Sequence, residues 1–234
     1  NERFYEDALR MLRAFRFSSK LGFEIENNTL DAIKKNAELI KFVSIERIVN
    51  EFKKLLAGKG NLKSLELLID SKLNSYIPFF EEVNEIQDLS SYSFCQSLYI
   101  LSIINDISFE KLKFLKLSNK EIKLVKQFDL INQEFKNNTQ IELILYKYNR
   151  EDIKFICEYF GYDKEKNIDE RILTINSFND IDITSQEIIS TINKNPGPWI
   201  KSITLELEKE ILLGRLNNNK KDILDFLSKL RDNI

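Results

Sequence analysis

Hydrophobic residues recur along this chain with the three-to-four-residue period of amphipathic α-helices. The run 45–56 shows the period most clearly, with Ser44 placed to cap its start and Gly58 placed to stop it. This pattern predicts a helix that buries one face against a core. Its apolar positions are Ile45, Ile48, Val49, Phe52, Leu55 and Leu56.

The first twenty-five residues predict a helix with one apolar side and one charged side. The apolar side carries Phe4, Ala8, Met11, Leu12 and Phe15. The charged side carries Arg3, Glu6, Asp7, Arg10, Arg13 and Lys20. On such a helix, residues spaced i and i+3 are neighbours, so Asp7 and Arg10 are expected side by side on one turn.

Helix signals continue to the end of the chain. Residues 118–121 and 184–187 both read as capping boxes that open helices. Pro198 suits the first position of a helix that ends at Gly214. With roughly a dozen helical segments and no alternating strand pattern, the fold class is predicted to be all-α. Breaks at Gly58-Lys-Gly60 and within residues 136–146 predict domain boundaries.

Composition excludes several kinds of chemistry. The chain has no histidine, which rules out histidine acid–base catalysis, histidine–zinc sites and a Ser-His-Asp triad on this chain. Cys95 and Cys157 show no metal-ligand spacing and favour a reducing compartment. The net charge of −2 argues against nucleic-acid binding by the whole surface, but a local basic face is compatible with it. The absence of a long apolar run predicts a soluble, cytoplasmic protein, and a start without methionine suggests a cut inside a longer one.

Asp7 and Arg10 could together read the edge of a nucleobase. An ionised Asp only accepts hydrogen bonds and Arg only donates them. Cytosine and adenine each present an amine donor beside a ring-nitrogen acceptor, whereas uracil and guanine present the reverse. A mismatched base would leave buried polar groups unpaired, at about 1–3 kcal/mol each. The alternative is an ordinary ion pair on a helix surface, worth about 0.2–0.5 kcal/mol.

A family resemblance favours the first interpretation. Glu6-Asp-Ala-Leu-Arg10, with its continuation to Phe23, resembles the neck motif of class II tRNA nucleotidyltransferases, the CCA-adding enzymes, and of bacterial poly(A) polymerases. In that family the motif selects CTP and ATP. The resemblance implies that Asp7 and Arg10 are the selecting pair, that Glu6 helps to hold the pocket, and that Arg13 lines it.

Two further stretches carry the resemblance. Val43–Leu55 is similar to the next neck motif, in which Glu46 and Arg47 would brace the neck helices together with Glu51 and Lys54. Asn195-Pro-Gly-Pro-Trp-Ile200 resembles the tail of Bacillus-type CCA-adding enzymes. There Trp199 is expected to be a buried anchor rather than a base-stacking residue.

The resemblance implies an elongated all-α array of three parts: a neck at 1–58, a body at 59–145 and a tail at 146–234. It implies tRNA 3′-CCA addition from CTP and ATP, with tRNA bound by its acceptor arm and elbow. The family's nucleotidyltransferase head, whose carboxylates bind Mg²⁺, has no counterpart in the sequence, so no catalytic or metal site is assigned and the fragment alone is expected to be inactive.

Other interpretations stay open at this stage. A poly(A) polymerase, an A-adding or a CC-adding enzyme would share the neck motif, and a stand-alone helical RNA-binding scaffold would have no nucleotide role. Asp180-x-Asp182 has the spacing of a metal-binding carboxylate pair, but no glycine-rich segment precedes it. Its carboxylates are expected to cap helices or face solvent.

Overall fold

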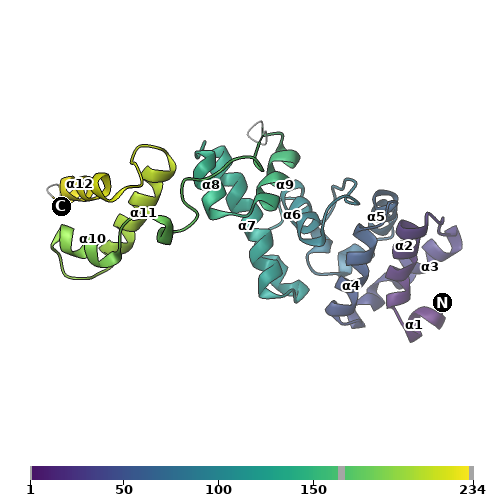
Figure 1. Cartoon of the computed structure of the whole chain (residues 1–234). Coiled ribbons are helices and arrows are strands. Elements are labelled where there is room, and N and C mark those ends of the chain that lie inside the picture. The colour runs from purple at the N-terminus through teal and green to yellow at the C-terminus, as the bar shows by residue number, and fades with distance from the viewer. Residues whose placement is uncertain (1, 163–166, 232–234) are drawn as a thin grey trace. The chain divides into compact units, whose positions relative to one another are not determined.

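The computed structural model describes residues 2–162 and 167–231, and within these ranges the chain is helical and contains no strand (Figure 1). The all-α prediction is therefore confirmed for the described residues. Contacts divide the chain into two compact units, Asn1–Asp129 and Leu130–Ile234. Neither boundary of the three-part division into 1–58, 59–145 and 146–234 falls at this point, and that division stays a prediction.

The first unit is built from short helices that pack around α2 and α4. Its elements are α1 (Glu2–Glu6), α2 (Leu9–Leu21), α3 (Asn27–Asn36), η1 (Ala37–Phe42), α4 (Ile45–Leu56), α5 (Asn61–Asp70), η2 (Asn74–Tyr76), η3 (Phe80–Glu82), α6 (Phe94–Ile104), η4 (Phe109–Leu115) and the first part of α7 (Asn119–Lys136). α2 packs directly against α4 and α5. The predicted stripe of α4 is buried except for Ile45, which is half-buried, and the Phe52 ring stacks on Phe80 with centroids 3.6 Å apart.

The single opening helix predicted from the sequence is wrong, because the helix breaks at Asp7. α1 ends at Glu6 and α2 begins at Leu9. The Asp7 carboxylate accepts a hydrogen bond from the backbone N–H of Leu9 at 3.3 Å. Short acidic side chains compete with the helix for backbone N–H groups in this way, and so favour breaks and helix starts.

α2 is fixed at its other end by a close backbone approach. The backbone N–H of Gly60 donates to the carbonyl of Ser19 at 2.9 Å, and the Ser19 hydroxyl donates to the carbonyl of Leu55 at 2.6 Å. A Cβ on Gly58 would lie 2.7 Å from the Ser19 carbonyl group, which is closer than van der Waals contact allows. Glycine is required here so that the loop after α4 can touch α2.

The predicted capping box at the start of α7 is confirmed. Glu121 accepts from the backbone N–H of Ser118 at 2.9 Å, and the Ser118 hydroxyl accepts from the N–H of Glu121 at 3.2 Å. Lys53 of α4 also donates to Glu121, at 2.8 Å. The hydrogen bond from Lys53 is the main cause that lowers the pKa of Glu121 to about 2, and the Ser118 bonds add to it.

Glu121 is therefore expected to make stability fall in acid. Because its pKa is depressed in the folded state, its contribution is present above the unfolded value near 4.5 and is lost as the pH falls toward 2. Glu121→Gln should lose about 1 kcal/mol of stability at pH 7 and show a shallower decline below pH 5 than the unmodified chain. Urea titrations between pH 2.5 and 7 measure both, and parallel pH profiles for the two proteins would contradict this.

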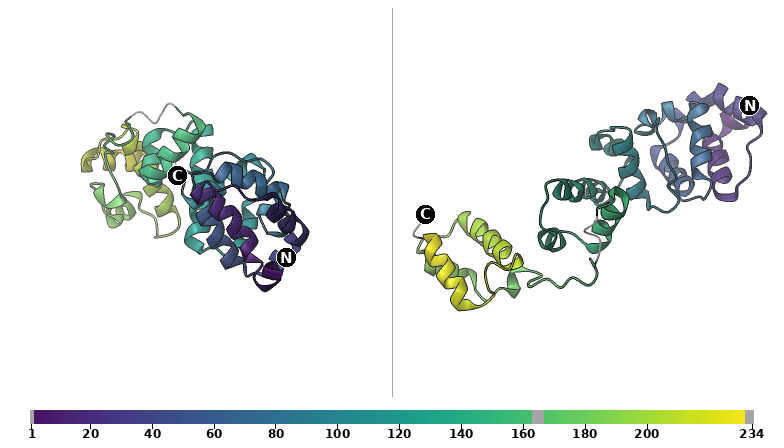
Figure 2. Two further views of the ribbon diagram at one scale, coloured as in Figure 1. Left: turned by 90° about the vertical axis from the view of Figure 1, so that its right-hand side faces the viewer. Right: turned by 90° about the horizontal axis from the view of Figure 1, so that it is seen from above.

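The second unit contains the remainder of α7 and the last five α-helices. These are α8 (Ile141–Lys147), α9 (Arg150–Phe160), α10 (Ser185–Ile192), α11 (Trp199–Leu212) and α12 (Lys220–Arg231), with η6 (Phe178–Asp180) between α9 and α10. Figure 2 shows α10, α11 and α12 grouped together, and a shared isoleucine- and leucine-rich core joins them. α10 opens with the predicted capping box of Thr184 and Glu187. Pro198 lies directly before α11.

The two tail features singled out in the sequence have structural roles. Trp199 packs against the core of α10–α12, and its indole N–H donates to the carbonyl of Asn195 at 2.7 Å, but its side chain is only partly buried, so the buried anchor is confirmed in part. The Asp180 carboxylate accepts from the N–H of Ser177 at 3.1 Å, and Asp182 accepts from the N–H of Lys220 at 3.0 Å. Both carboxylates thus cap helices, as predicted.

Candidate nucleotide-selecting site

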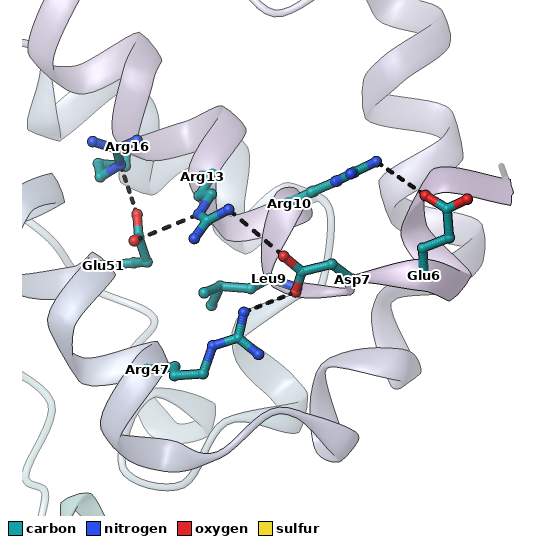
Figure 3. Close-up of polar contacts among 8 residues, drawn as sticks. All are labelled: Glu6, Asp7, Leu9, Arg10, Arg13, Arg16, Arg47 and Glu51. Carbon is teal, nitrogen blue, oxygen red and sulfur yellow. Dashed lines mark hydrogen bonds and ion pairs between the residues drawn. The ribbon is translucent and has the colours of Figure 1, made fainter.

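Asp7 lies at the break between α1 and α2, where its carboxylate faces α4 (Figure 3). Its Oδ1 accepts from the Leu9 backbone N–H at 3.3 Å and from an Nη2 of Arg47 at 3.1 Å. Its Oδ2 faces Nη1 of Arg13 at 3.6 Å. The Asp7 side chain keeps 24% of its surface exposed, so it is not sealed in the core.

A buried glutamate organises the arginines next to Asp7. Glu51 on α4 has a side chain that is only 8% exposed, and its carboxylate lies 2.6 Å from Nε of Arg16 and 3.6 Å from Nε of Arg13. Arg13 therefore connects Glu51 to Asp7, and Arg47 holds Asp7 from α4 (Figure 3). Three side chains from two helices fix the position of one partly exposed carboxylate.

Arg10 points in another direction from Asp7. Its Nη1 lies 3.4 Å from the Glu6 carboxylate, and Figure 3 shows the side chain extending toward α1 rather than toward α4. Arg10 and Glu6 are both largely exposed, with 43% and 67% of their side-chain surface accessible. The ordinary Asp7–Arg10 ion pair considered from the sequence is not formed, because each residue pairs with another partner.

The arrangement leaves hydrogen-bonding capacity on both residues. An ionised carboxylate offers about four acceptor positions. Leu9 and Arg47 occupy two of them on Oδ1, and Arg13 faces Oδ2 at 3.6 Å, which leaves Oδ2 a second acceptor position for an amine. A guanidinium has five N–H donors. The long, exposed contact of Arg10 with Glu6 is a weak one that a ligand can replace.

Two family models match the chain in succession. The model described as "Probable RNA and SrmB- binding site of polymerase A" matches residues 22–84. The model described as "tRNA nucleotidyltransferase domain 2 putative" matches residues 94–227, which is more than half of the chain. The chain belongs to the tRNA nucleotidyltransferase family. The resemblance inferred from the neck and tail motifs is thereby confirmed.

Individual members of the tRNA nucleotidyltransferase family agree with this assignment. The CCA-adding enzyme of Staphylococcus aureus strain RF122 is 32% identical over 97% of this chain and 61% of its own length. That of Staphylococcus epidermidis is 28% identical over 97% of this chain and 62% of its own length. The chain thus spans about three fifths of these relatives.

A solved structure shares the fold. The crystal structure of the Bacillus stearothermophilus CCA-adding enzyme in complex with CTP matches with a TM-score of 0.87 at 24% identity, over 99% of this chain and 64% of that one. At this identity the match establishes the helical architecture of this tRNA nucleotidyltransferase chain.

The structure brings half of the predicted site residues into direct contact. Asp7 pairs with both Arg13 and Arg47, whereas Glu6 and Arg10 form a separate pair. Glu46 lies one residue before Arg47 and pairs with Lys116 at 2.9 Å. Sequence reasoning missed Arg16, although its i, i+3 spacing from Arg13 could have indicated that both reach the same carboxylate.

The described residues do not fit a metal ion. No group of three or more aspartate, glutamate, cysteine or histidine side chains within the described ranges is arranged to hold one. No step is therefore assigned to Mg²⁺ on these residues. Of the helices in the same ranges, none combines the length and apolar character that a bilayer-spanning helix needs.

Proposed function

We propose that this chain selects CTP and ATP and binds tRNA for the addition of the 3′-terminal CCA sequence. Asp7 accepts a hydrogen bond from the amine of cytosine or adenine, and Arg10 donates to the adjacent ring nitrogen. Glu6 holds Arg10 until a base arrives, while Arg13 and Arg47 keep the Asp7 carboxylate in place. Glu46 supports this end of α4 through Lys116.

The placement of Asp7 carries the proposal. It is an acidic side chain at a helix break, held by Arg47 and Arg13, and its side chain is still 24% exposed. A carboxylate held in this way costs little reorganisation when it accepts a hydrogen bond, which is what strong discrimination between bases requires. The family assignment and the CTP complex of the Bacillus relative agree with a nucleotide substrate.

The head domain and its Mg²⁺ remain part of the proposal for the whole enzyme. This chain matches only about three fifths of the length of the CCA-adding relatives. We infer that the nucleotidyl transfer chemistry belongs to the unmatched part. The tRNA acceptor arm and elbow are proposed to contact the body and tail. A-form RNA is recognised mainly by shape and backbone contacts, which suits a helical protein with exposed lysines.

A chimera tests the proposal. The part of the Staphylococcus aureus CCA-adding enzyme that this chain matches is replaced by this chain, and the product is supplied with a tRNA that lacks its CCA end. We expect sequencing of the extended tRNA to show C, C and A added in order. Products ending in CC alone, in A alone or in poly(A) would instead identify the other family activities.

A chimera that fails to extend the tRNA could be misfolded or could have a different function. Binding of the trimmed tRNA to the unmodified chain is therefore measured in parallel. Binding without any extension, in a chimera whose circular dichroism spectrum and melting temperature are normal, would favour a helical RNA-binding scaffold and would contradict the nucleotide role.

A further inference from the structure

One stretch of the first unit is far more basic than the chain as a whole. Residues 110–126 contain six lysines and two glutamates, a net charge of +4 within a chain of net charge −2. The stretch includes most of η4 and the first turns of α7. Its lysines are Lys111, Lys113, Lys116, Lys120, Lys123 and Lys126.

The six lysines differ in whether a carboxylate neutralises them. Lys111 binds Glu81 and Glu82, Lys116 binds Glu46 at 2.9 Å, and Lys126 binds Glu110 at 2.7 Å. The other three, which are Lys113, Lys120 and Lys123, are exposed and form no ion pair with a carboxylate in the described part of the chain. Lys113 does contribute to the lowered pKa of Glu110, after the stronger effects of Lys126.

The acidic residues of the stretch do not cancel this charge. Glu121 is engaged by Lys53 of α4 and by the backbone of Ser118. Glu110 is engaged by Lys126. The positive charge of Lys113, Lys120 and Lys123 therefore faces solvent without a paired anion, and a bound polyanion would gain from displacing the counterions around it.

An exposed aromatic side chain lies beside one of these lysines. The Phe114 side chain is 51% exposed, and the ammonium of Lys113 lies 5.2 Å from the centre of its ring. Exposed aromatic rings flanked by lysines are typical of surfaces that bind single-stranded nucleic acid, where the ring stacks on a base and the lysines contact phosphates. An acidic protein segment would gain little from the open face of the ring.

Contacts connect this surface to the candidate site. Lys116, at the end of η4, binds Glu46, and the next residue of α4, Arg47, binds Asp7. The end of η4 is thus joined to the helix that carries Arg47, and the Lys53–Glu121 bond holds the start of α7 to the same helix. An RNA strand whose 3′ end lies at Asp7 could run along η4 and the start of α7.

We propose that Lys113, Lys120, Lys123 and Phe114 form a lysine surface that binds the backbone of an RNA strand leading away from the candidate site. The lysines contact phosphates and Phe114 stacks on a base. This inference rests on the proposed function, because it takes the strand to be the 3′-terminal part of the tRNA substrate.

Salt dependence of RNA binding tests the lysine surface. The unmodified chain and Lys120→Gln/Lys123→Gln are titrated with a tRNA lacking its CCA end at several KCl concentrations. Each phosphate contact contributes about 0.7–0.9 to the slope of log affinity against log salt, so we expect the double variant to lower the slope by about 1.4–1.8. The affinity near 0.15 M salt should fall by about tenfold.

The matched control removes the same charge from the same stretch. Lys111→Gln/Lys126→Gln changes the net charge equally but removes lysines that already bind carboxylates. We expect its slope to change by less than about 0.5. Thermal unfolding of each variant checks that the fold is retained. Equal slopes for the two double variants would overturn the lysine surface in favour of a general effect of net charge.

Phe114→Leu tests the stacking part separately. We expect about a tenfold loss of affinity with an unchanged salt slope, because leucine keeps apolar area but cannot stack on a base. An unchanged affinity would overturn the role of Phe114. Displacement of the RNA by polyglutamate of equal charge would show that the surface binds any polyanion and would overturn the assignment to RNA.

The outcomes separate this inference from the proposed function. If the unmodified chain binds the tRNA and neither lysine pair matters, only the lysine surface is overturned. If the unmodified chain binds no tRNA at all, the proposed function and the lysine surface are both contradicted.

Discussion

Asp7→Ala and Arg10→Ala are each expected to destroy the preference for CTP and ATP over UTP and GTP in the chimeric enzyme. The loss should be about 10- to 200-fold per variant, since each removes one hydrogen bond whose mismatch leaves a buried group unpaired, at about 1–3 kcal/mol. Competition of the four nucleotides for incorporation into trimmed tRNA measures the preference.

Two controls make the result specific. Lys20→Ala changes an exposed residue at the far end of α2 and should leave base choice unaltered. Arg47→Ala removes a partner of Asp7 but not the carboxylate itself. If Asp7 served only to anchor α4, Asp7→Ala and Arg47→Ala would lower stability alike and neither would change base choice, which would contradict the selecting role.

Glu51→Ala is expected to lower the free energy of unfolding by about 3 kcal/mol. The Glu51 carboxylate is 8% exposed and lies against Arg16, whose side chain is only 14% exposed. Removing one partner of a buried ion pair leaves the other charge buried without compensation, which costs about 3–5 kcal/mol. Urea unfolding followed by circular dichroism measures the change.

Glu46→Ala provides the matched comparison on the same helix. Glu46 pairs with Lys116 at the surface, where both side chains are more than half exposed. Exposed pairs of this kind contribute far less to stability than buried ones, because water and salt screen them. A loss at Glu51 no larger than the loss at Glu46 would contradict the organising role assigned to Glu51, because burial is the feature that separates the two glutamates.

The helix caps and buried helix faces were predictable from sequence because they depend on residues that are close together in the chain. The apolar stripe of α4, the capping boxes at Ser118 and Thr184 and the placement of Pro198 before α11 each depend on residues close together in the chain. The same holds for Asp180 and Asp182, whose bonds to backbone N–H groups follow from their short side chains.

The geometry of the candidate site was less predictable because it depends on contacts distant in sequence. Periodicity favoured one continuous opening helix, but the Asp7 carboxylate competes for a backbone N–H and ends α1. Arg47, forty residues away, then draws Asp7 toward α4 and away from Arg10. The role of Arg16 depends on Glu51 being buried, which the sequence of α2 alone does not indicate.

The contact between Ser19 and the Gly58–Gly60 loop has a mechanical consequence for substrate exchange. It anchors the C-terminal end of α2 to the loop after α4. Under the proposed function one pocket accepts first a pyrimidine and then a larger purine, and we expect the adjustment at the break of Asp7 and Ala8 between α1 and α2 rather than at the anchored end. Substitutions that restrict the backbone of this break should therefore impair the change of substrate more than the binding of either nucleotide.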